Sequence, residues 1–327
     1  MATLFTGIGA GASYSGTHIS PGFHGMWGNR VWFVDYDNGT VGGSGDRPDD
    51  ACKNLQTIID KAGEWDTIYI RPRDPDSAGG DPQAIIPAST TNWSIAYTKH
   101  GLSLIGTGIG IGMRQTNMTR LQASATTSTT STMTCYAPYV NFENLTFRRG
   151  GTTGAGLLIE GQTSGGSGYA FNTIVNNCGF WKIGATATKG AVYYESAWHC
   201  LTANSHFEEC AKGVGIGVSG SNVVGINVIG CTFNGIDTTI DTDIYATGGS
   251  TITEVLIDKC LFAHDIPALA SGNLYNKYID FATASGLIAN SAFGTETETI
   301  ATNMDRSNCD VVNCWFTNTT NLFPNND

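Results

Sequence analysis

The sequence predicts an all-β solenoid, in which short strands wind into coils that stack on one another. Three observations predict it: a phenylalanine that recurs in the second half of the chain, an asparagine three residues before most of these phenylalanines, and a composition rich in Gly and poor in charge. Of the 327 residues, 42 are Gly and 14% are charged, against about 7% and 25% in ordinary globular domains. Helical bundles and coiled coils are excluded, because Gly weakens each helix interior that it enters.

Seven similar segments align on the recurring phenylalanine, at irregular intervals of 23 to 33 residues. An irregular period of this size is typical of solenoid coils whose loops differ in length. The aligned residues are Phe147, Phe180, Phe207, Phe233, Phe262, Phe293 and Phe316. We expect them to stack about 4.8 Å apart, which is the spacing of hydrogen-bonded strands.

The aligned segments share one internal register. The fifth residue before the Phe is apolar in six of the seven segments, and the second before it is mostly Cys or Ser. Five Asn and one Gly occupy the third position before it, which indicates a turn with an unusual, left-handed backbone. The sequence therefore predicts a strand, a one-residue bend at Asn, and a second strand. Four cysteines then fill small interior slots, namely Cys178, Cys231, Cys260 and Cys314.

The N-terminal half predicts the closed end of the solenoid. A strand begins at Val31, a helix covers about 50–62, and a further strand covers 67–70. Asp49 and Asp50 lie at the start of the helix, where carboxylates favour the helix dipole. A capping helix is needed because an open sheet edge pairs with other chains.

This pattern resembles the right-handed parallel β-helix of the pectate-lyase-like superfamily, over about residues 31–320. The segment LSLIGTGIG from Leu102 is similar to a coil of such proteins, and the helix is similar to their N-terminal cap. The resemblance implies one β-helix domain over 31–327. Residues 1–30 do not belong to the repeat and are rich in Gly, so we expect an extended N-terminal arm there. The resemblance also implies two functional settings, since β-helices of this kind include polysaccharide-cleaving enzymes and proteins of bacteriophage virions.

The charge balance limits the partners. Lys and Arg number 17 against 28 Asp and Glu, which gives a net charge of -11, and no basic run exceeds Arg148–Arg149. We therefore expect neither nucleic acid nor a membrane as a partner. The first 20 residues contain no Lys or Arg, so we expect no signal peptide. The nine cysteines are then expected to be free thiols.

No cofactor and no metal is expected. The glycines at 106, 108, 110 and 112 do not have the spacing of a dinucleotide-binding loop. The His/Cys cluster of the sequence, which comprises His199, Cys200, His206 and Cys210, matches no common zinc pattern.

A pair of carboxylates is the best candidate for catalysis. Glu160 and Glu195 follow apolar strands, 13 and 15 residues after the preceding Phe, and neighbouring coils would place them about 5 Å apart. Glycoside hydrolysis needs two carboxyl groups about 5 to 9.5 Å apart. Four side chains near the second carboxylate are predicted to form a glycan-binding face: Tyr193, Tyr194, Trp198 and His199. The alternative is that two stacked Glu simply lie on the solvated surface of the solenoid.

We expect the protein to be a structural component of a bacteriophage virion surface, either a capsid decoration or a tail appendage. In this hypothesis it is a homotrimer, its N-terminal arm binds other virion proteins, and it is assembled in the host cytoplasm. The alternative is a tailspike-type protein that binds or depolymerises a host surface glycan with the two carboxylates.

Overall fold

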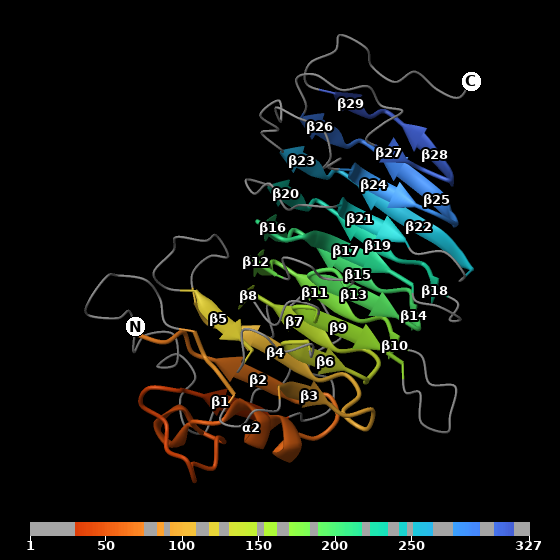
Figure 1. Cartoon of the computed structure of the whole chain (residues 1–327). Helices are drawn as coiled ribbons and strands as arrows, with labels where there is room; N and C mark the ends of the chain where they lie inside the picture. The colour runs from red at the N-terminus through yellow and green to blue at the C-terminus, as the bar shows by residue number, and fades with distance from the viewer. Residues whose placement is uncertain are drawn as a thin grey trace.

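A computed structural model confirms the predicted fold class: the chain forms a right-handed parallel β-helix of three parallel sheets (Figure 1). The structure describes residues 30–74, 84–87, 92–108, 118–123, 131–148, 154–161, 170–183, 189–217, 223–234, 242–246, 251–263, 277–294 and 304–316. The predicted arm lies outside the described residues, except for Arg30.

Sheet 1 is the largest of the three sheets, and strands from successive coils run side by side in it. In the described part of the chain ten of its strands follow one another along the rod: β1 (Val31–Val34), β2 (Thr67–Ile70), β4 (Ser103–Gly106), β7 (Asn141–Glu143), β11 (Ile174–Asn176), β15 (Leu201–Ala203), β19 (Asn227–Ile229), β22 (Ile252–Asp258), β25 (Ala284–Ala289) and β28 (Asn308–Val312). A second row joins the sheet through β22 and comprises β10 (Ala170–Phe171), β14 (Ala197–Trp198) and β18 (Val223–Val224).

Sheets 2 and 3 form the other two faces of the rod. Sheet 2 contains β5 (Thr119–Gln122), β8 (Leu145–Arg148), β12 (Gly179–Trp181), β16 (His206–Glu208), β20 (Thr232–Asn234), β23 (Leu261–Ala263), β26 (Ala292–Gly294) and β29 (Trp315–Phe316). Sheet 3 contains β3 (Trp93–Ile95), β6 (Met133–Cys135), β9 (Leu157–Glu160), β13 (Val192–Glu195), β17 (Lys212–Ile216), β21 (Thr242–Ala246), β24 (Lys277–Phe281) and β27 (Met304–Asp305). A coil runs from sheet 3 to sheet 1 and then to sheet 2.

The predicted phenylalanine column is confirmed. Neighbouring rings from Phe147 to Phe293 lie 4.6 to 5.2 Å apart and are nearly parallel. The predicted slot residues are buried beside them: Cys178, Ser205, Cys231, Cys260, Ser291 and Cys314. One continuous apolar core therefore runs through the described coils, from Trp32 to Cys314.

The predicted asparagine bend is also confirmed, and it joins sheet 1 to sheet 2. The left-handed conformation, with φ between 48° and 55°, occurs at Asn144, Asn177, Asn204, Asn290 and Asn313. The side-chain amide of Asn177 donates to that of Asn144 at 3.3 Å, and Asn313 donates to Asn290 at 2.7 Å. Midway along the rod, Asn204 donates instead to Asn176 at 3.1 Å, so the amide ladder is not strictly regular.

The cap helix is shorter than the prediction of 50–62. It is α2 (Leu55–Lys61), preceded by the 3₁₀ turn η1 (Pro48–Asp50). The segment between them cannot be helical, because Cys52 pairs with the edge strand β1 through hydrogen bonds to Phe33 and Asp35. Asn54 then caps α2, and its side chain accepts hydrogen bonds from two backbone N–H groups of the first turn. The apolar face of α2 packs against β1, β2 and β3.

Each sheet is paired at the N-terminal end of the rod. The backbone of Cys52 pairs with β1, and the backbone of Ile85 pairs with β5. At the edge of sheet 3, the side-chain amide of Gln56 takes the place of a strand: it donates to Ser94 O at 3.0 Å and accepts from Ser94 N at 2.9 Å. None of the helices in the described residues is long and apolar enough to span a bilayer.

Candidate functional site

The two predicted carboxylates lie side by side on the outer face of sheet 3. Glu160 ends β9, Glu195 ends β13, and the two residues are direct register partners in the parallel pair. Their side chains point outward, because Ile159 and Tyr194 on the same strands face the core. Glu160 and Glu195 follow their phenylalanines by different numbers of residues because the connections from sheet 2 to sheet 3 differ in length. These connections cover 149–156 in one coil and 182–191 in the next.

The two carboxylates have different surroundings. Lys189 Nζ lies 3.1 Å from Glu195 Oε2 and 5.3 Å from the centre of the Tyr193 ring. Partial burial raises the pKa of Glu160, the neighbouring charge of Glu195 raises it further, and Lys189 offsets part of this rise. The raised pKa of Glu160 and the ion pair between Glu195 and Lys189 give the two carboxyl groups unequal surroundings, which is the kind of division that acid–base chemistry uses.

Tyr136 extends this row, and the sequence reasoning missed it. It directly follows Cys135, which is the register partner of Ile159, so Tyr136 lies one coil before Glu160. Burial and the charges of both carboxylates raise the pKa of Tyr136. An alignment of the ends of the sheet 3 strands would have predicted the position of Tyr136. The position of Lys189 could not be predicted in this way, because Lys189 lies in the connection before β13 and not in the repeat.

The predicted glycan-binding face does not form, because its four members point in different directions. Tyr194 is fully buried in the core, where its hydroxyl group hydrogen-bonds to Thr202 at 2.6 Å. Tyr193 lies on the outer side of sheet 3 but is only 3% exposed, in a small cluster with Tyr245. The prediction that these two rings face a glycan is therefore wrong, since a sugar cannot reach a covered ring.

Trp198 and His199 lie around a corner from the carboxylates. Ser196 has a left-handed backbone that turns the chain out of sheet 3, so Trp198 lies in β14 of sheet 1. There the Trp198 ring meets Phe171 edge to face at 5.6 Å. His199 is exposed at the following bend. The structure thus brings Glu160 and Glu195 together and separates them from the predicted aromatic side chains.

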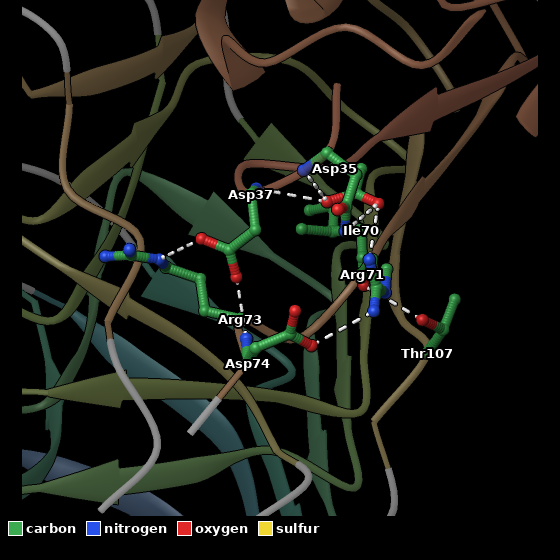
Figure 2. A network of polar contacts seen from close by, with 8 residues as sticks. Asp35, Asp37, Ile70, Arg71, Arg73, Asp74 and Thr107 are labelled. Atoms are coloured by element: carbon green, nitrogen blue, oxygen red, sulfur yellow. Dashed lines mark hydrogen bonds and ion pairs between the residues drawn. The ribbon is translucent and has the colours of Figure 1, made fainter. Parts of the chain in front are cut away.

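A second polar cluster lies near the N-terminal end of the rod (Figure 2). Arg71 bridges Asp35 at 2.7 Å and Asp74 at 3.0 Å, and Arg73 binds Asp37 at 2.9 Å. Burial raises the pKa of Asp35, but hydrogen bonds from Asn38 and Arg71 outweigh it, and the pKa lies below its ordinary value. These charges satisfy one another, so the cluster holds the segment after β2 against the turn after β1.

The described residues contain no group of three His, Cys, Asp or Glu side chains arranged for a metal ion. In the His/Cys cluster of the sequence, Cys200 and Cys210 are buried, whereas His206 lies on the outer face of sheet 2. The two cysteines therefore face the core and the two histidines face outward, so the four side chains do not converge on one point.

Comparisons with known proteins support the fold. Neither a protein-family model nor a curated protein matches the sequence. Among solved structures, a GH136 lacto-N-biosidase from Eubacterium ramulus has a TM-score of 0.50 and 9% identity, covering 88% of this chain and 55% of that one. ORF18 of Geobacillus virus E2 has a TM-score of 0.43 and 13% identity, over 79% of this chain and 49% of that one. A pectate lyase, Pel9A, has a TM-score of 0.42 and 10% identity, over 88% and 80%.

The likeness to the lacto-N-biosidase concerns the fold alone, and it agrees with the parallel β-helix that the three sheets of this chain form. The chain spans about half the length of the first two structures, at 49% and 55% of their residues. At such identities the likeness concerns the path of the backbone, and function must be argued from the side chains of this chain.

Proposed function

We propose that the protein is a structural component of a bacteriophage virion surface, a capsid decoration or tail appendage attached through residues 1–30. The observation that supports this is the polarity of the rod. Strand β1 begins sheet 1 at one end and β28 lies at the other, so the described coils advance in one direction along the axis (Figure 1). A rod held at its first coil presents its last coils to the surroundings.

The closed N-terminal end of the rod fits this role. There α2 covers the core, and Gln56, Cys52 and Ile85 pair with the edges of the three sheets. The segment that precedes Arg30 is therefore not needed to close the described end of the rod. In the proposal it is available to bind a capsid or tail protein.

Deletion of residues 1–30 tests the attachment. The truncated rod should keep the circular dichroism spectrum and melting temperature of the full chain, but it should no longer bind particles that lack this protein. Particle binding is measured by co-sedimentation, with the full-length chain as the control. A folded truncated protein that still co-sediments would overturn the proposed role of the arm.

A homotrimer is part of the same proposal, and exposed apolar side chains on the last coils support it. Leu261, Leu287 and Trp315 are 42%, 37% and 41% exposed, and Leu261 and Trp315 lie in one column of sheet 2. Light scattering after gel filtration should give three times the 34.6 kDa of one chain. Replacing Leu261 and Trp315 by Ser should lower that mass, and a wild-type monomer at micromolar concentration would contradict the trimer.

A second candidate function is cleavage of a host surface glycan, and the unequal surroundings of Glu160 and Glu195 favour it. Register partners on neighbouring strands place the carboxyl groups about 5 Å apart, the separation of about 5 to 5.5 Å that is used for retaining glycoside hydrolysis. Glu160 would protonate the leaving oxygen, and Glu195 would attack or stabilise the sugar. Lys189 would hold the Glu195 side chain in place through their 3.1 Å ion pair.

Amide substitutions test this candidate. Glu160→Gln and Glu195→Gln should each lower oligosaccharide release from purified host surface polysaccharide at least a hundredfold. The matched control is Glu143→Gln, which removes a carboxylate from the outer face of sheet 1. Lys189→Met should raise the pKa of Glu160 further in a carbonyl NMR titration, because it removes the cation that lowers it. No release by the wild type would reject the enzyme function and leave the structural role untouched.

A further inference from the structure

The outer face of sheet 2 carries a basic and aromatic patch that is separate from the carboxylates on sheet 3. Leu121, Phe147 and Phe180 face the core from β5, β8 and β12. The alternate residues therefore face outward. They form two columns in register: Arg120, Thr146 and Gly179 in one, and Gln122, Arg148 and Trp181 in the other.

Three cations surround the indole ring of Trp181. The guanidinium carbon of Arg148 lies 4.5 Å from the ring centre, that of Arg120 lies 5.1 Å away, and Lys182 Nζ lies 5.5 Å away. Lys182 also pairs with Glu209 at 2.9 Å. Within the described residues, Arg148 makes no ion pair, so its positive charge is held on the indole without a counter-ion.

Two of the buried polar atoms of the patch that have no hydrogen-bond partner belong to Trp181 and Thr146. They are the indole Nε1–H of Trp181 and the hydroxyl oxygen of Thr146. A buried donor left without a partner costs about 1–3 kcal/mol, so native structures keep few of them. Thr146 and Trp181 lie on the neighbouring strands β8 and β12. Thr146 is 1% exposed, whereas Arg148 and Trp181 are partly open to solvent. An acceptor group that reached this point would satisfy both donors and face the uncompensated guanidinium.

The next coil limits the size of the group that can bind. Trp181 is the register partner of Glu208, and Glu209 follows it. Glu208 lies 3.4 Å from the imidazole of His206. These carboxylates would repel a long polyanion that ran along the rod, so the patch suits one oxyanion and not a nucleic acid strand.

We propose that Arg148, Trp181 and Thr146 form a binding site for a single oxyanion, a carboxylate or phosphate group carried by a small ligand such as an acidic sugar. The guanidinium of Arg148 binds the anion through charge-assisted hydrogen bonds. The Nε1–H of Trp181 and the hydroxyl group of Thr146 donate to its remaining oxygens. The site lies on another sheet from Glu160 and Glu195, and it does not depend on the proposed function.

NMR of the indole N–H groups tests the site. The chain has seven Trp residues, and the Trp181→Phe variant assigns the signal of Trp181. Full-length protein is titrated separately with inorganic phosphate, glucuronate and neutral glucose. The Trp181 signal should shift saturably with phosphate, glucuronate or both, and not with glucose. The two anions distinguish a phosphate site from a site for acidic sugars.

Arginine variants provide the control. Arg148→Gln should weaken the binding of the anion at least tenfold, and Arg148→Lys should weaken it less, because it keeps the charge. Arg306→Gln removes an equal charge from an exposed residue near the end of the rod and should change nothing. The proposal is overturned if the Trp181 signal does not respond to either anion, or if Arg148→Gln and Arg306→Gln weaken the response equally.

Discussion

The side chain of Phe207 shows how single residues stabilise the rod. Its ring lies 4.9 Å from Phe180 and 4.7 Å from Phe233, and the residue is 2% exposed. Phe207→Ala removes the ring between two others and leaves a cavity that neighbouring coils cannot close. We expect a loss of about 3–5 kcal/mol in the free energy of unfolding, measured by urea denaturation. Phe207→Leu should cost less, and equal losses for the two variants would contradict the packing argument.

The buried thiols predict a loss of stability at alkaline pH. Burial raises the pKa of Cys135, Cys178, Cys200 and Cys210 from 9.0 to about 12. Above pH 9 these thiols ionise in the unfolded chain while they stay protonated in the folded one. Their contribution is therefore complete below pH 9 and is lost as the pH rises towards 12.

Urea denaturation between pH 8 and pH 11 measures this loss. The slope of unfolding free energy against pH should be smaller in Cys178→Ala than in the wild type, because one titrating thiol is absent. The native protein should also fail to react with a thiol reagent at pH 8. An unchanged slope would contradict the effect of burial on Cys178.

Sequence reasoning at the residue scale succeeded where the repeat constrains the side chain. The phenylalanine column and the small slots follow from the register of the repeat. The neighbouring positions of Glu160 and Glu195 follow from the order of the coils, since each residue ends an apolar strand. It failed at Tyr193 and Tyr194, which it treated as surface residues because they are polar aromatics near a carboxylate. Strand alternation puts Tyr194 inside, and Tyr193 is covered together with Tyr245 outside. The positions of Lys189 and Arg120 could not be predicted, since no repeat governs the loops and contacts that place them.

At the scale of elements, the bend between sheets 1 and 2 depends on its left-handed residue. Asn204 has a φ of 48°, and Gly230 takes the equivalent place in the next coil. Asn204→Ala should cost about 1–2 kcal/mol, because a Cβ without a polar side chain disfavours this conformation. Asn204→Gly should cost clearly less, because Gly adopts it without strain.

The control for this bend is Asn176→Ala. It removes the 3.1 Å hydrogen bond from Asn204 but leaves the backbone of the bend unchanged. Thermal unfolding of the three variants separates the hydrogen bond from the backbone conformation. If Asn176→Ala were as harmful as Asn204→Ala, the hydrogen bond and not the backbone would be the cause.

The cap shows what local signals can predict about an element. Leu55, Ile58 and Ile59 recur at helical spacing, and all three are buried on the apolar face of α2. Its start was placed too early because Asp49 and Asp50 resemble a helix N-terminus. Asp50 instead accepts a hydrogen bond from Ser44 N in the preceding loop. The strand-like pairing of Cys52 with β1 is a tertiary contact that helix propensity cannot reveal.

At the scale of the whole molecule, the rod must keep its sheet edges from pairing with other chains. A β-helix has open edges only at its two ends, and exposed edges are templates for association. At the N-terminal end Cys52, Gln56 and Ile85 occupy the hydrogen-bonding groups of the three edge strands. The helix α2 then covers the core that these edges surround. The cap therefore serves both stability and solubility, and the two roles can be separated experimentally.

Ile58→Asp and Gln56→Met separate the two roles of the cap. Ile58 is fully buried under the cap, and a carboxylate there should detach α2 at a cost of about 4 kcal/mol or more. Sedimentation velocity should then show species larger than the wild type that grow with concentration, because the end of the core is open. Gln56→Met removes the two hydrogen bonds to Ser94 but keeps the helix, and should cost about 1 kcal/mol. If Ile58→Asp unfolds at lower urea concentration yet sediments as the wild type does, α2 stabilises the core without guarding its edges.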